Sequence, residues 1–99
     1  MRAAEIVTTY LIERVRRDAV GRVIDVMWFR HVRSEPVSIA TSNIVSVQTV
    51  VKALYSGAQV KLVVGRAIFG ADVFVSPDGT TIIDAPMDAL FKLSELPEL

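Results

Sequence analysis

The 99 residues suit one domain spanning residues 1–99, and the absence of cysteine excludes disulfides, thiol catalysis and thiolate metal sites. A cysteine-free chain suits a reducing compartment, so we expect a cytoplasmic protein. Eleven basic residues balance eleven acids, and the apolar fraction of 52% is high for so small a domain, which favours a homo-oligomer over a monomer rich in Val and Ile.

No membrane partner is expected. The longest uncharged stretch, Pro36 to Val51, is interrupted by polar side chains and is shorter than the roughly 20 apolar residues that a membrane span needs. Residues Met1 to Glu5 contain no continuous apolar run, so no signal peptide is expected.

The first strong pattern in chain order is a β-hairpin with strands over 9–17 and 22–29. The intervening Asp18-Ala19-Val20-Gly21 has Asp and Gly where a type I turn followed by a bulge needs them. This turn places Asp18 opposite Arg22 and Ile12 opposite Trp28. A helix is the competing interpretation, because the apolar residues of 6–15 also recur at helical spacing.

Both faces of this hairpin are apolar, which predicts a central position in a sheet or a cover by a second subunit. In the expected register one face carries Ile12, Ile24, Val26 and Trp28. The other face carries Leu11, Val15, Val23, Met27 and Phe29.

The middle of the chain predicts a short edge strand over 35–39 and then a helix over 47–56. Ser46 is a suitable N-cap for this helix, and Gly57 stands where a left-handed residue ends one. The apolar stripe at helical spacing consists of Val47, Val50, Val51, Leu54 and Tyr55.

The last third predicts a strand over 59–64, a bend or bulge between Gly65 and Gly70, and a second hairpin over 71–75 and 80–84. The turn of this hairpin is Ser76-Pro77-Asp78-Gly79, and its register places Asp72 opposite Asp84. A short helix follows over about 86–93, with Pro86 at its first position. Its apolar residues Met87, Leu90, Phe91 and Leu93 are spaced to dock on the sheet.

These elements predict an α+β fold. We expect a mostly antiparallel sheet of about five strands, one central helix (about 47–56) and a short C-terminal helix (about 86–93).

No pattern predicts a catalytic or metal site, and no cofactor is expected. His31 is the only histidine; a general base would need a partner and a cleft, and one histidine without cysteine is too little for a zinc site of about four ligands. Asp78 belongs to a turn and Asp88 to a helix start, and Ala71 and Asp72 follow Gly70 where a phosphate-binding loop needs Lys and Ser or Thr.

The charge is uneven along the chain. Residues 1–33 contain seven arginines and four acids, a net charge of +3, and the remainder has a net charge of −3. Arginines interleaved with aromatic residues on a sheet are one way to bind single-stranded nucleic acid or another protein. The candidate interaction patch consists of Tyr10, Arg14, Arg16, Arg22, Trp28, Arg30, His31 and Arg33. In the expected register its arginines on the hairpin, Arg14, Arg16, Arg22 and Arg30, share one face with Tyr10 and Trp28.

Three motifs resemble a family of short bacterial and phage-associated proteins classed as a domain of unknown function. They are the hairpin segment 21–26, the helix segment 50–57 and the leucine- and proline-containing end, Leu93-Ser94-Glu95-Leu96-Pro97-Glu98-Leu99. The resemblance covers roughly residues 9–99 and implies no particular activity.

The leading functional hypothesis is a small non-enzymatic protein-interaction domain that associates with itself or with another protein. The alternatives are a nucleic-acid-associated accessory protein that uses the arginine and aromatic hairpin, and an enzyme of unrecognised type.

Overall fold

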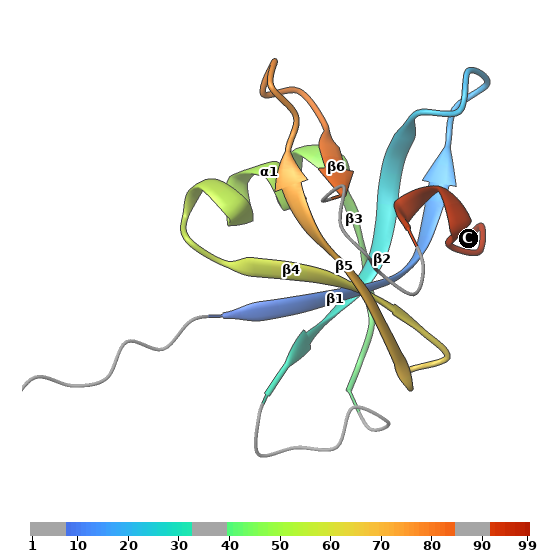
Figure 1. Ribbon diagram of the computed structural model, residues 1–99, viewed down its shortest axis with the longest axis vertical. Coiled ribbons are helices and arrows are strands. Elements are labelled where there is room, and N and C mark those ends of the chain that lie inside the picture. The colour runs from blue at the N-terminus through green and yellow to red at the C-terminus, as the bar shows by residue number, and fades with distance from the viewer. Residues whose placement is uncertain (1–7, 33–39, 85–91) are drawn as a thin grey trace, which may run out of the picture.

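The computed structural model describes residues 8–32, 40–84 and 92–99, and these form a single six-stranded sheet with one α-helix (Figure 1). The strand order is β3-β2-β1-β4-β5-β6. In chain order the elements are β1 (Thr9–Arg17), β2 (Val23–His31), β3 (Asn43–Ser46), α1 (Val47–Tyr55), β4 (Gln59–Val64), β5 (Ile68–Val75), β6 (Ile82–Asp84) and the 3-10 turn η2 (Leu93–Glu95).

The α+β class is confirmed, but the sheet differs from the expected one in size and strand direction. It has six strands instead of about five, and β1 and β4 are parallel, whereas the other neighbours are antiparallel. The expected strand over 35–39 lies outside the described residues. The short strand β3, which the sequence did not predict, pairs with β2 and leads directly into α1.

The first hairpin has the predicted turn. Gly21 has a φ of 88°, and the Asp18 N–H donates to the Arg22 carbonyl at 2.8 Å. Ile12 lies opposite Trp28, as expected. The sheet also twists this hairpin away from the rest of the molecule, so that its turn projects from the body (Figure 1).

A β-bulge at Glu13 changes the faces of β1 beyond this point. The pairing skips from Ile12 to Arg14, so Val15 joins Ile12 in the main core instead of lying on the other face. A second shift beside Ile24 leaves that side chain 39% exposed, although the regular alternation placed it inside.

Helix α1 begins and ends as its sequence predicts. The Ser46 hydroxyl accepts a hydrogen bond from the Thr49 N–H, and Gly57 follows the helix with a φ of 96°. Val47, Val50 and Val51 are buried against the sheet, which α1 crosses on one face (Figure 1).

The second hairpin has the predicted turn, with a φ of 76° at Gly79, but its register is one residue away from the expected one. Asp84 lies opposite Val73, and Asp72 instead faces Lys61 of β4. The expected pairing of two like charges is therefore wrong, and each carboxylate has a compatible neighbour.

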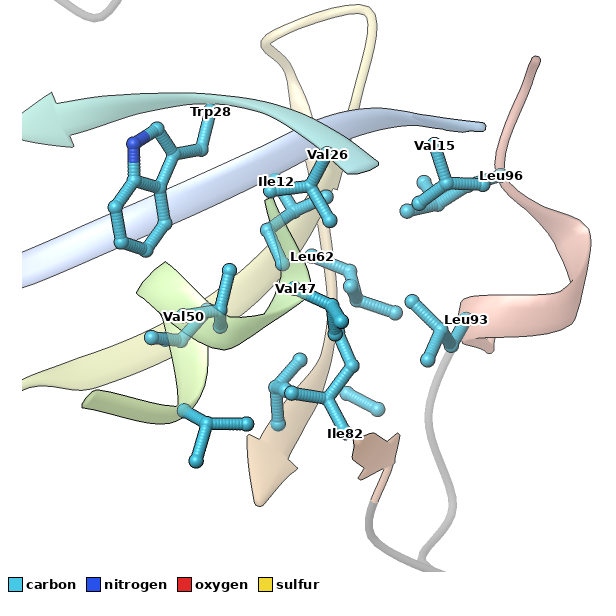
Figure 2. Packing of buried hydrophobic residues seen from close by; sticks show 14 residues of the cluster. Ile12, Val15, Val26, Trp28, Val47, Val50, Leu62, Ile82, Leu93 and Leu96 are labelled. Carbon is cyan, nitrogen blue, oxygen red and sulfur yellow. The ribbon is translucent and has the colours of Figure 1, made fainter. Parts of the chain in front are cut away.

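The main core lies between α1 and the sheet. Figure 2 shows Ile12, Val26 and Trp28 from the first hairpin, Val47 and Val50 from α1, and Leu93 and Leu96 from the C-terminal segment in this cluster. A smaller cluster of Leu11, Phe29 and Val63 lies on the opposite face of the sheet.

The C-terminal segment is not α-helical where the structure describes it. Residues 86–91 of the expected helix lie outside the described part, Lys92 is extended, and a 3-10 turn begins at Leu93. The chain then runs parallel to β1. The Val15 N–H donates to the Pro97 carbonyl at 3.0 Å, and the Leu99 N–H donates to the Val15 carbonyl at 2.8 Å. This segment thus covers the part of β1 that β4 does not reach.

Candidate interaction surface

The two aromatic residues of the predicted patch form part of the core. Tyr10 and Trp28 stack with their ring centroids 4.0 Å apart and an interplanar angle of 11°. Trp28 is 6% exposed, and Tyr10 is half-buried against the same cluster. The indole face is therefore already covered by a protein side chain.

Arg14 and Arg16 lie on the opposite face of the sheet from this aromatic pair. They pair with Met27 and Asp25, which alternate with the buried Val26 and Trp28 on β2. The expectation of one shared face is wrong because the bulge at Glu13 reverses the alternation. Arg16 forms an ion pair with Asp25 at 2.9 Å.

The remaining patch residues are spread over the molecule. Arg22 forms an ion pair with Asp18 in the hairpin turn (3.2 Å), Arg30 is exposed near the far end of β2, and the half-buried His31 ring lies 6.4 Å from the Phe69 ring. Arg33 lies outside the described residues. The described members of the patch therefore do not form one continuous surface.

Two charged residues that the sequence analysis missed form the most connected polar cluster. The Arg66 guanidinium donates to both carboxylate oxygens of Glu13 at 3.2 Å, to the Ala40 carbonyl at 2.7 Å and to the Ser42 hydroxyl at 2.8 Å. It also lies 4.5 Å above the Phe29 ring. Ser42 donates its hydroxyl proton to Glu13. The cluster joins the bulge of β1, the β4–β5 turn and the start of β3.

The Glu13 carboxyl remains ionised in this cluster. Burial alone would raise its pKa, but the hydrogen bonds from Arg66 and Ser42, with the positive charges of Arg66 and Arg14, outweigh burial and lower the pKa. A carboxylate with a lowered pKa is a poor general base at neutral pH, so the cluster is suited to holding three segments together.

An apolar area is exposed on the outer face of β5 and β6, the face away from α1. Phe74 lies between the buried Val73 and the half-buried Val75, so its side chain points outward, where it is 50% exposed. Ile83 lies directly opposite Phe74 on β6 and is 41% exposed.

A loosely associated ion pair lies beside this apolar pair on the same face. The Lys61 ammonium is 3.4 Å from the Asp72 carboxylate, and the two side chains are 43% and 54% exposed. Asp72 and Phe74 are two residues apart on β5 and therefore share a face.

A cleft of about 300 Å³ opens between the first hairpin turn, β6 and η2. Three cationic residues and one acid line it, namely Arg17, Arg22, Lys92 and Asp84. Its other lining residues are Gly21, Val23, Thr81, Ile82, Ile83, Leu93 and Ser94.

Arg17 holds the wall of this cleft in place. Its guanidinium binds the Glu98 carboxylate at 2.6 Å and the carbonyls of Leu93 and Leu96 at 3.1 and 3.3 Å. Arg17 is one of the seven arginines of residues 1–33, and its sequence context predicts no role for it. Its partners lie more than 70 residues away, and no local pattern points to them.

Within the described ranges 8–32, 40–84 and 92–99, no three His, Asp or Glu side chains converge to hold a metal ion. The same ranges contain no helix with the length and apolarity to cross a membrane.

Comparisons with protein-family models, curated proteins and solved structures returned no match. The resemblance to a domain family of unknown function therefore stays a prediction.

Proposed function

We propose that this protein is a small non-enzymatic interaction domain that self-associates through the outer face of β5 and β6. The observation that carries the proposal is the exposed pair Phe74 and Ile83, which lie directly opposite each other on β5 and β6. Adjacent exposed apolar side chains mark interaction surfaces more often than scattered single ones do. Aromatic residues are also frequent anchors of interfaces.

The charges beside this pair favour a second copy of the chain as the partner. A two-fold dimer brings the same surface of each copy together. A residue away from the two-fold axis therefore contacts a different residue of the other copy, whereas a residue on the axis contacts its own equivalent. Lys61 and Asp72 carry opposite charges on one face, 3.4 Å apart and about half exposed. In such a dimer Lys61 of each copy meets Asp72 of the other, and Phe74 packs at the centre.

Sedimentation velocity over a range of protein concentrations tests this proposal. The wild-type chain is expected to change from monomer to dimer as its concentration rises. Substitution of Phe74 by Ser is expected to raise the dissociation constant by about tenfold or more, because it removes the aromatic anchor.

Tyr55→Ser is the matched control, because Tyr55 is 71% exposed on α1, away from the outer face of β5 and β6. This variant is expected to dimerise like the wild type. A wild-type chain that stays monomeric at the highest soluble concentration would overturn the proposal, and so would equal effects of the two substitutions.

A further inference from the structure

We infer that the cleft between the first hairpin and the C-terminal turn binds a small organic anion. Such a ligand would carry one phosphate or carboxylate group on a compact apolar body. The volume of about 300 Å³ is at the lower end of the range for small-molecule sites. The inference does not rest on the proposed self-association, although Ile83 both lines the cleft and belongs to the exposed pair.

Two cationic side chains at the rim of the cleft, Arg22 and Lys92, are only partly engaged by other described residues. The Arg22 side chain is 76% exposed, and its ion pair with Asp18 uses only Nε, so its two terminal nitrogens make no hydrogen bond to a described residue. Lys92 is exposed and forms no ion pair with a described residue. Arginine and lysine side chains at a cleft favour anionic ligands.

The acids near the cleft are engaged by other groups. Asp84 accepts a hydrogen bond from the Leu93 N–H at 2.9 Å, and Glu98 is paired with Arg17. Asp18 accepts the backbone N–H groups of Val20 and Arg22 as well as the Arg22 side chain. Arg17 is thus occupied by Glu98, and the positive charge available to a ligand comes from Lys92 and from the terminal nitrogens of Arg22.

The rest of the lining points to a ligand with an apolar part. Ile82 and Leu93 are buried members of the main core, and Val23 packs against that core. The hydroxyls of Thr81 and Ser94 add two groups that donate hydrogen bonds to an anion. Inorganic phosphate can contact only the polar residues of such a site and leaves its apolar residues without a partner.

The cleft is also held in shape before a ligand arrives. Arg17 binds the carbonyls of Leu93 and Leu96, and the Glu95 side chain accepts the Lys92 N–H at 2.8 Å. These contacts fix the wall that carries Lys92 and Ser94. A preformed wall lowers the conformational cost of binding.

Titration of the ¹⁵N-labelled full chain with phenyl phosphate, benzoate and inorganic phosphate tests the inference by NMR. Phenyl phosphate or benzoate is expected to cause saturable shifts at Gly21, Arg22, Thr81 and Ser94. Whichever of phenyl phosphate and benzoate has the lower dissociation constant identifies the preferred anionic group. Inorganic phosphate should bind more weakly than phenyl phosphate. Equal affinities for phosphate and phenyl phosphate would overturn the assignment to an organic anion.

Arg22→Gln and Lys92→Gln should each weaken binding by roughly three- to tenfold. Arg30→Gln and Lys52→Gln are the matched controls, because these cations are exposed outside the cleft. The inference is wrong if no anion causes saturable shifts, or if the controls weaken binding as much as the cleft variants. The Phe74→Ser chain should bind the anion normally, which separates this site from self-association.

Discussion

At the scale of single residues, the pair of Glu13 and Arg66 makes the clearest energetic contribution. The Glu13 side chain is 16% exposed and the Arg66 side chain 25%, so the pair is partly shielded from water. Loss of one member leaves the other charge partly buried with unmade hydrogen bonds, which is more costly than loss of an exposed pair.

We therefore expect Glu13→Gln to lower the free energy of unfolding by about 1–3 kcal/mol at pH 7. Asp25→Asn is the control, because Asp25 pairs with the half-exposed Arg16, and its effect should stay within about 1 kcal/mol. Urea denaturation of both variants measures the difference. Equal decreases in the free energy of unfolding would show that the Glu13–Arg66 pair stabilises the fold no more than an exposed ion pair does.

The same pair predicts a pH dependence with a definite sign. The pKa of Glu13 is lowered in the folded state, so the unfolded chain binds a proton at higher pH than the folded chain does. The stability from Glu13 is complete above the unfolded pKa of about 4.3 and is lost as the pH falls through the folded pKa. The difference in unfolding free energy between wild type and Glu13→Gln should shrink over this acidic range. A constant difference down to pH 2 would contradict the role of Glu13.

Trp28 gives a second prediction at this scale, because it is the only tryptophan and is 6% exposed. Its fluorescence should be blue-shifted in the folded protein and poorly accessible to iodide. A single-stranded oligonucleotide should leave this fluorescence unchanged, since Tyr10 already stacks on the indole. Quenching by the oligonucleotide would instead favour the nucleic-acid hypothesis, which relied on Trp28 as a stacking platform.

At the scale of elements, the C-terminal segment behaves as part of the sheet. Leu96 is 3% exposed in the main core, whereas Leu99, three residues later, is 36% exposed. The backbone between them makes two hydrogen bonds to Val15. This arrangement predicts very different effects for two leucines in the same short segment.

Leu96→Ala should lower the free energy of unfolding by about 2–4 kcal/mol, because it leaves a cavity in the core. Leu99→Ala should change it by about 0.5 kcal/mol or less. Thermal and urea denaturation measure both values. Similar small effects would mean that the segment is not docked on β1.

The elements that the sequence predicted well are those with local signals. The two hairpin turns, the Ser46 cap and the end of α1 at Gly57 each depend on residues within a few positions of one another. The contact of Ile12 with Trp28 follows from the first turn. These features were therefore within reach of a sequence interpretation.

The features that were missed depend on distant contacts or on a single extra residue. The parallel pairing of β1 with β4 joins residues about 50 positions apart, and no local pattern specifies it. Glu13 looks like an ordinary polar residue in an alternating strand, yet its bulge moves Arg14 and Arg16 away from Trp28. The expected common face of these arginines and Trp28 was wrong for this reason. The roles of Arg17 and Arg66 were missed because their partners are far away in sequence.

At the scale of the whole molecule, the outer face of β5 and β6 is an apolar surface that packing within the described chain leaves exposed. Buried Val, Leu and Ile side chains account for part of the high apolar content. Phe74 and Ile83 remain outside it, beside charges of both signs. A dimer through this face explains the exposure of the apolar pair and the position of the charges.

The central claim is tested most directly by exchanging the charges of Lys61 and Asp72. Lys61→Glu and Asp72→Lys should each weaken self-association by about tenfold, because each places like charges opposite one another twice across the two-fold axis. An equimolar mixture of the two variants should dimerise like the wild type, since every contact then joins opposite charges. Sedimentation velocity that shows two weakened variants and a restored mixture is the predicted result; a mixture no tighter than either variant alone would contradict the account.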